Sequence, residues 1–199
     1  CQNEEKEEVA MANELRIETQ MEYSKSGRKL PVHDSFFADA SGDEYTFQRQ
    51  SVGTASEAID IGSDVGTKGL LYIKNLDASN YVLVGSRCYE LGWDTESVAL
   101  TQGLKVTGGS SGATGWILYK TSTNVILTDV NGTFTNDETL TDSGSGSVLV
   151  NGTISDVSPA FFAKLKAGES ALVRVAGNDD LMSVANSSAC IVEYFLVED

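Results

Sequence analysis

The chain contains a single histidine, His33, and histidine is the side chain that most often transfers protons near neutral pH. His33 follows Pro31 in a polar stretch, and no serine on a strand–turn–helix elbow accompanies it. We interpret His33 as a surface-loop residue. The sequence therefore predicts no catalytic residue, and we expect no enzyme activity.

Side chains that bind metal ions are also scattered. Zinc sites need clustered cysteine, histidine and carboxylate ligands, which one histidine and three cysteines at this spacing do not supply. Calcium needs a dense set of oxygen ligands, and neither acidic loop that offers some has EF-hand spacing. The two loops contain Asp60, Ser63 and Asp64, and Asn178, Asp179 and Asp180. We interpret both as solvated turns and expect no metal site and no cofactor.

The cysteines are Cys1, Cys88 and Cys190, an odd and widely spaced set that is not a disulfide framework. Cys190 belongs to the apolar run 189–192, which predicts a small buried hydrophobic residue. A disulfide between Cys88 and Cys190 on neighbouring strands is the alternative.

Two further patterns resemble ligand sites without meeting their requirements. The glycine-rich run 108–115 lacks the Lys-Ser/Thr ending of a phosphate-binding loop, and we expect no helix after it. Trp93 and Trp116 offer the aromatic surface of a sugar-stacking platform. Because Trp116 begins an expected strand, we expect it in a hydrophobic core instead.

The composition limits the class of protein. With 199 residues, 41% of them hydrophobic, the chain is long enough for one domain with a small insertion. Nineteen glycines, two prolines and short bursts of Val, Ile, Thr, Tyr and Phe are typical of many short strands. A net charge of −15 opposes binding to nucleic acid and to anionic membranes. No apolar run reaches the roughly 18 residues of a membrane span.

Residues 1–13 are acidic and have no core-forming pattern, so we treat them as an acidic N-terminal arm. The segment 11–15 resembles a natural start of translation. Three explanations remain open for what precedes it: a vector-derived or upstream in-frame extension, a genuine acidic arm, or a lipoprotein lipidated at Cys1.

The elements that position these side chains are organised around residues 165–175. Gly168 supplies the positive φ of a tight turn between two apolar runs. This pattern predicts a hairpin corner in a β-sandwich of jelly-roll or immunoglobulin-like type. We expect residues 69–76 and 189–197 to pair with it. Residues 15–23 should form a half-buried first strand, and this strand and 189–197 are the expected sheet edges.

The composition changes after the first half of the chain. Residues 101–155 hold only six charged residues: Lys105, Lys120, Asp129, Asp137, Glu138 and Asp142. Glycine- and serine-rich runs at 107–112 and 141–146 each lead into an expected strand. These features predict a barrel-like lobe of about five strands at residues 97–156. The lobe would interrupt a discontinuous sandwich domain of residues 14–96 and 157–199.

Several of these motifs together resemble a group of small structural proteins encoded in tailed-phage virion gene clusters. The insert separately resembles small β modules of phage head and tail proteins. The resemblance implies a component of the phage particle and transfers no catalytic residue. The motifs outside the insert are 11–15, 53–58 with 69–82, and 165–175 with 192–199; those of the insert are 111–115, 130–134 and 138–140.

We therefore expect a non-enzymatic virion structural protein, in the first place an accessory capsid decoration protein. Its sandwich would dock on the assembled shell and its inserted lobe would project. The expected partners are the major capsid protein or other virion proteins, and further copies of the chain in a homo-oligomer such as a trimer. A tail or neck component and an extracellular carbohydrate-binding module are the alternatives.

Overall fold

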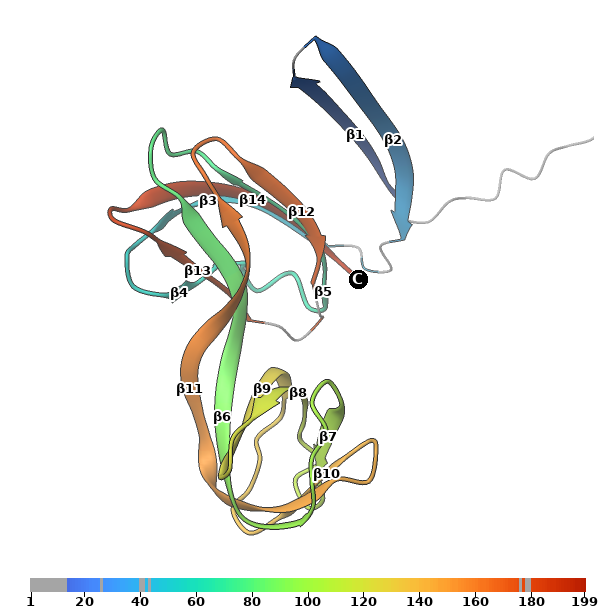
Figure 1. Ribbon diagram of the computed structural model, residues 1–199, viewed down its shortest axis with the longest axis vertical. Coiled ribbons are helices and arrows are strands. Elements are labelled where there is room, and N and C mark those ends of the chain that lie inside the picture. The colour runs from blue at the N-terminus through green and yellow to red at the C-terminus, as the bar shows by residue number, and fades with distance from the viewer. Residues whose placement is uncertain (1–13, 26, 40–41, 43, 176, 178–179) are drawn as a thin grey trace, which may run out of the picture.

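The structure is a computed structural model that describes residues 14–25, 27–39, 42, 44–175, 177 and 180–199. All of its regular elements are strands, so the expected all-β fold is confirmed. The expected acidic arm at residues 1–13 lies outside the described residues. The strands form a two-stranded hairpin, a sandwich and a closed ring; in Figure 1 the ring is joined to the sandwich by the long strands β6 (Val82–Val98) and β11 (Ser147–Leu165).

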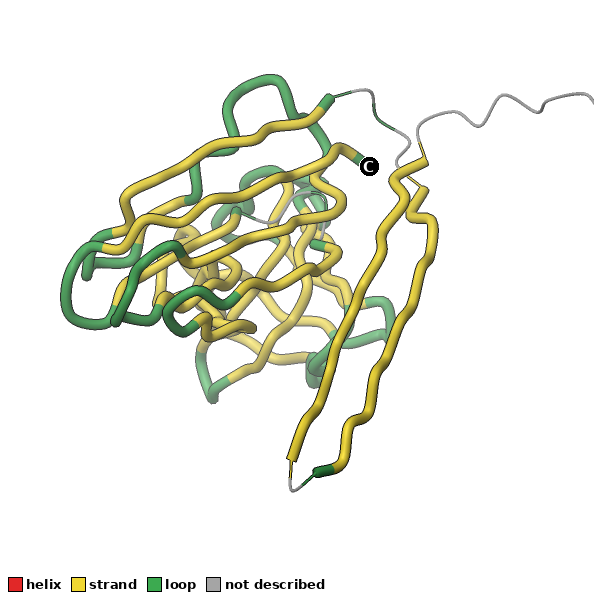
Figure 2. Tube along the Cα trace, turned by 90° about the horizontal axis from the view of Figure 1, so that it is seen from above, coloured by secondary structure: helices red, strands yellow, loops and turns green. Residues whose placement is uncertain are grey.

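The first two strands pair only with each other. They are β1 (Glu14–Lys25) and β2 (Arg28–Asp39), and they run antiparallel along their whole length. This hairpin of β1 and β2 extends from one end of the molecule in both views (Figures 1 and 2). We call the hairpin the arm; it does not include residues 1–13. The expectation that residues 15–23 form an edge of the sandwich is therefore wrong. Alternating hydrophobicity correctly predicted a strand at these residues. It could not show that the strand pairs with β2 in a two-stranded ribbon instead of joining a sheet of the sandwich.

The sandwich consists of a four-stranded sheet and part of an eight-stranded sheet. The four-stranded sheet has the order β12-β5-β14-β3. Its strands are β3 (Tyr45–Val52), β5 (Lys68–Asn75), β12 (Ser170–Arg174) and β14 (Cys190–Glu198). Opposite it lie β4 (Glu57–Ala58), β13 (Leu181–Ala185) and the sandwich halves of β6 and β11. The core between the sheets includes the buried side chains of Leu71, Ile73, Val82, Val84, Val192 and Tyr194.

The corner predicted at residues 165–175 is present. Gly168 has a φ of 74°, and β12 pairs with β5 as expected. However, β14 does not contact β12 as a sheet neighbour, because β5 lies between them. The C-terminal strand is also not an edge, since it pairs with β5 on one side and β3 on the other. An interior strand can carry apolar residues on both faces, which explains why the sequence pattern was ambiguous.

The ring is built on two long strands, β6 (Val82–Val98) and β11 (Ser147–Leu165), which continue from the sandwich. These strands pair with each other through five register shifts. Four short strands close the ring in the order β11-β10-β7-β8-β9-β6. They are β7 (Lys105–Gly108), β8 (Thr114–Lys120), β9 (Asn124–Asn131) and β10 (Thr139–Asp142). We call this closed ring the barrel.

The barrel has its own hydrophobic core, which begins before residue 97. Leu91 and Trp93 of β6 belong to it, together with Leu127, Leu140 and Val150. The expected boundaries at residues 97 and 156 thus fall within two continuous strands. That residues 97–156 fold independently stays a prediction. The expectation that Trp116 is a core residue is wrong: 43% of it is exposed, whereas Trp93 is 7% exposed.

Candidate functional site

The outer face of the four-stranded sheet, which points away from the sandwich core, carries an open row of hydrophobic side chains. Cross-strand pairing aligns Phe47, Phe195, Tyr72 and Leu172 across all four strands. Phe47 is 59% exposed and Leu172 is 38% exposed, and the two central rings are half-buried. Tyr45 extends the row, with its ring centroid 5.7 Å from that of Phe195. A contiguous apolar surface of this kind is typical of a binding site for another protein.

Charged side chains border the hydrophobic row on both sides. On one side, Arg49 Nη2 lies 2.6 Å from Glu193 Oε2, and these two residues are directly paired between β3 and β14. On the other side, Arg174 Nη1 lies 2.6 Å from Asp199 Oδ1. These pairs are partly exposed, so they contribute little to stability. They give the face a polar rim around an apolar centre, as protein interfaces have.

The base of the arm packs on this same face. Ile17 of β1, Ala38 of β2 and Leu70 of β5 form a small cluster in which each residue is 9% exposed. A hollow of about 350 Å³ lies beside it, between β1 and the hydrophobic row, and includes Tyr72 and Phe195 in its lining. The arm continues well beyond this small cluster with the sandwich.

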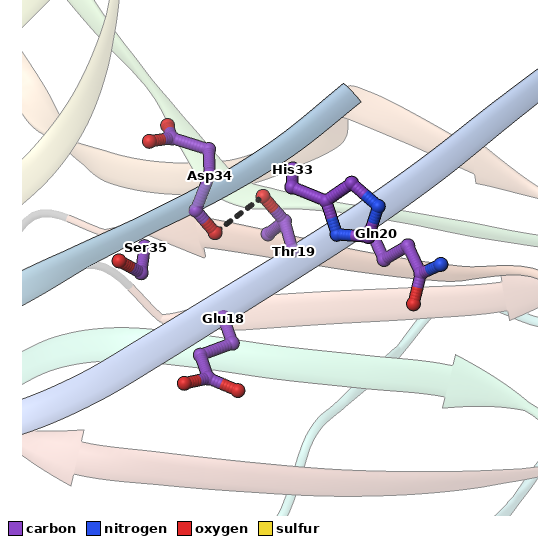
Figure 3. A pocket seen from close by; sticks show the side chains of 6 residues that line it. All are labelled: Glu18, Thr19, Gln20, His33, Asp34 and Ser35. Carbon is purple, nitrogen blue, oxygen red and sulfur yellow. Dashed lines mark hydrogen bonds between the residues drawn. The ribbon is translucent and has the colours of Figure 1, made fainter. Parts of the chain in front are cut away.

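The single histidine lies on the arm. His33 is exposed and belongs to β2, so the expected loop position is wrong, although it is on the surface as expected. A hollow of about 440 Å³ surrounds it, and its six lining residues come only from β1 and β2 (Figure 3). Thr19 Oγ1 donates a hydrogen bond to the Asp34 carbonyl oxygen at 3.4 Å. Both walls of this hollow belong to one two-stranded ribbon, and among the described residues no other element lines it to enclose a substrate.

The carboxylate of Glu138, the residue immediately before β10, is buried and only 4% exposed. Its two oxygens accept hydrogen bonds from the amides of Ser110 (3.1 Å), Ser111 (2.9 Å) and Thr135 (2.7 Å). Burial raises the pKa of Glu138, but these hydrogen bonds outweigh it and lower the pKa to about 2. The glycine-rich loop between β7 and β8 thus directs its backbone amides at a carboxylate of the chain itself, in the way that a phosphate-binding loop directs its amides at a phosphate.

Asp142 plays the same part at the other end of β10. It accepts hydrogen bonds from the amides of Thr101 (2.7 Å), Gly144 (2.8 Å) and Gly146 (2.6 Å). The two glycine- and serine-rich runs at 107–112 and 141–146 therefore belong to loops whose amides each bind a carboxylate of this chain. Both carboxylates fix loops of the barrel and face no cavity for a substrate among those described.

The carboxylates of the two acidic loops accept hydrogen bonds from nearby backbone amides and hydroxyl groups of this chain. Asp60 Oδ1 accepts the Gly62 amide at 3.0 Å, and Ser63 Oγ donates to Asp64 Oδ1 at 3.3 Å. Asp180 accepts from Tyr89 Oη at 3.2 Å. Its neighbours, residues 178–179, lie outside the described residues. Within the described ranges, no three His, Cys, Asp or Glu side chains gather closely enough to hold a metal ion.

Cys88 and Cys190 are not joined in a disulfide, so that alternative is wrong. Both are buried, and Cys190 belongs to the sandwich core as the apolar run around it predicted. Cys1 lies outside the described residues.

The barrel exposes two aromatic side chains on one strand. Trp116 and Tyr119 of β8 are 43% and 47% exposed. They pair with Thr128 and Ile126 of β9, which are two residues apart and so share one face of that strand. The alternative of a platform made by Trp93 and Trp116 is not formed, because Trp93 lies in the barrel core. Tyr119 is the aromatic neighbour that sequence reasoning missed, because a bulge in β8 shifts it onto this face.

No family model, curated protein or solved structure matches this chain. In the part of the chain that the structure describes, no helix has the length and hydrophobicity needed to span a membrane.

Proposed function

We propose that this chain is a non-enzymatic structural protein of a tailed-phage virion, in the first place an accessory capsid decoration protein. The placement of exposed hydrophobic side chains carries the proposal. Of the 16 large hydrophobic side chains exposed in the described residues, ten lie on the arm or on the outer sheet face. They are Met21, Tyr23, Leu30, Val32, Phe36, Phe37, Tyr45, Phe47, Leu172 and Ile191. Such a concentration favours a protein whose work is association.

The arrangement of the parts supports docking in one orientation. The arm and the barrel lie at opposite ends of the sandwich (Figure 1). The arm and outer face would contact the shell, and the barrel would project from it. The resemblance of several sequence motifs to phage structural proteins is the reason for proposing the phage shell as the docking partner. A tail or neck component would use the same arm and outer sheet face.

A sugar-binding module is the second candidate, and one observation favours it. Trp116 and Tyr119 present two exposed aromatic rings on the barrel, at the end that would face outwards. Aromatic faces of this kind stack on the apolar faces of sugar rings, and hydroxyl and charged neighbours add hydrogen bonds. Thr128 and Lys105 are the residues paired with Trp116 on either side.

Immunogold labelling of particles in negative stain tests the proposal. Antibodies against the full chain are applied to phage particles from the source that encodes it. Label on the heads supports the decoration role, and label on tails or necks moves the protein there. Particles without label would contradict a virion role, and a glycan array with the wild-type chain and Trp116→Ser then tests the sugar-binding alternative.

A further inference from the structure

We propose that the arm docks on the outer sheet face of a second copy of this chain, so that copies associate by exchanging arms. The inference rests on the proposed function for its setting, since a particle brings copies side by side. The contact itself is a property of this chain and is testable without a particle.

The arm is an amphipathic ribbon. Cross-strand pairs on one of its faces are Leu15 with Ala38, Ile17 with Phe36, Met21 with Val32, and Tyr23 with Leu30. The opposite face carries mostly charged or polar residues, including Arg16, Glu18, Glu22, Lys29 and His33. From Leu15 to Tyr23, this face of the arm is thus apolar except for the pair of Thr19 and Asp34.

Only the base of this apolar face is covered. Ile17 and Ala38 are 9% exposed against Leu70, but beyond Thr19 the side chains of Met21 and Tyr23 are 62% and 60% exposed. Across the ribbon, Leu30 is 62% exposed. An isolated two-stranded hairpin is at best marginally stable in water, so the outer half of the arm needs a further layer.

The chain itself offers a surface of the required kind. The row of Phe47, Phe195, Tyr72 and Leu172 is open, and it lies on the sheet that already binds the base of the arm. The contact of Ile17 with Leu70 shows that the apolar face of the arm and the outer face of this sheet fit together. A second arm would continue that established contact along the row.

The occupant is a second copy and not the chain's own arm. The described lining of the hollow beside the row includes β1 only up to Thr19. The end of the β1–β2 ribbon that carries its turn lies away from the four-stranded sheet (Figure 1). Reciprocal exchange between two copies forms the contact twice and closes the pair.

Mixed-copy crosslinking of the full chain tests the exchange. One copy carries Val32→Cys on the apolar face of the arm, the other carries Phe47→Cys on the outer sheet face, and both carry Cys1→Ser. Because no single copy holds both new thiols, a heterodimeric disulfide requires contact between copies. The matched control replaces Val32→Cys by Glu22→Cys, which places the thiol on the polar face of the same arm. We expect efficient heterodimer formation with Val32→Cys and little with the control; equal yields would overturn the proposal.

Light scattering at micromolar concentration supplies a second readout. The double variant Met21→Ser with Leu30→Ser should raise the dissociation constant of the copies roughly 100-fold or more, since it removes two large apolar side chains from the contact. Glu22→Gln should leave association unchanged, and circular dichroism confirms that each variant is folded. A wild-type chain that is strictly monomeric would overturn the proposal. If that monomer still bound particles through its arm, the shell would be the occupant and the proposed function would stand. If copies exchange arms but bind no particle, the exchange of arms would stand and the proposed function would fail.

Discussion

Replacing Glu138 by Gln should destabilise the barrel. The carboxylate of Glu138 accepts three backbone amides and is also within hydrogen-bonding distance of the Ser110 and Ser111 hydroxyls, at 3.1 and 2.9 Å. A glutamine amide group turns one acceptor into a donor, which then faces amide donors in a site that is 4% exposed. Losing a charge-assisted hydrogen bond and leaving a buried donor unsatisfied each cost about 1–3 kcal/mol. We expect a loss of about 2–4 kcal/mol in the free energy of unfolding of the barrel at neutral pH.

The same carboxylate makes the effect depend on pH. The pKa of Glu138 is lowered from 4.5 to about 2 in the folded chain, so its charge stabilises the fold above 4.5. The stabilisation is lost as the pH falls from 4.5 through about 2. The difference of about 2.5 between these pKa values corresponds to roughly 3 kcal/mol, which agrees in order of magnitude with the loss expected from Glu138→Gln. The difference between the wild type and Glu138→Gln should therefore narrow over this pH range.

Urea unfolding followed by tryptophan fluorescence measures both effects. The background variant Trp116→Phe leaves Trp93, in the barrel core, as the reporter. The matched control is Glu169→Gln, an exposed carboxylate that accepts the Lys166 amide at 2.9 Å in the sandwich, and it should change the barrel transition little. Unchanged barrel stability in Glu138→Gln at neutral pH, or a difference that does not narrow in acid, would refute the role assigned to Glu138.

Three further changes test how the two long strands join the parts. Gly85→Ala should lower the free energy of unfolding by about 1–3 kcal/mol, because a Cβ at this position of β6 would overlap the Ala160 backbone of β11. Thermal melting measures the effect, and Gly53→Ala is the control because there is room for a Cβ at Gly53. Leu91→Ala should cost the barrel about 2–5 kcal/mol in urea unfolding reported by Trp93, although Leu91 precedes residue 97; an unchanged barrel would show that the core does not extend into β6. Deleting residues 97–156 should leave a sandwich that melts cooperatively, since its core draws on none of them; loss of the β signal in circular dichroism throughout would argue against two separately stable parts.

Local patterns in the sequence were sufficient where the structure depends on one turn or one face. Gly168 marked the corner before β12, and the apolar run around Cys190 marked a buried strand. These signals work because a left-handed turn strongly favours glycine and because a buried face excludes charge. The same signals do not show how many strands pair with a given strand. The sequence therefore predicted β14 at a sheet edge, although it lies between β5 and β3.

The long strands and the arm were harder to predict for different reasons. Register shifts interrupt the alternation of β11, so its hydrophobic pattern was divided into two shorter strands. In the arm, a turn at Gly27 joins two segments of equal length, and the alternation of β1 was recognised. The alternation of β2 was not, because Pro31 and the adjacent pair Phe36 and Phe37 obscure it. In both cases a local irregularity in the chain hid the alternation that identifies a strand.

The continuity of β6 and β11 has a mechanical consequence. Both strands leave the sandwich at the same end, so a force that pulls the barrel outwards stretches them in the same direction and does not slide one past the other. The load passes instead into shear of the hydrogen bonds between β6 and β13 in the sandwich and between β6 and β9 in the barrel. The covalent backbone of two strands thus works as a tether. A projecting barrel attached in this way would unravel at its short strands before it separated from the sandwich.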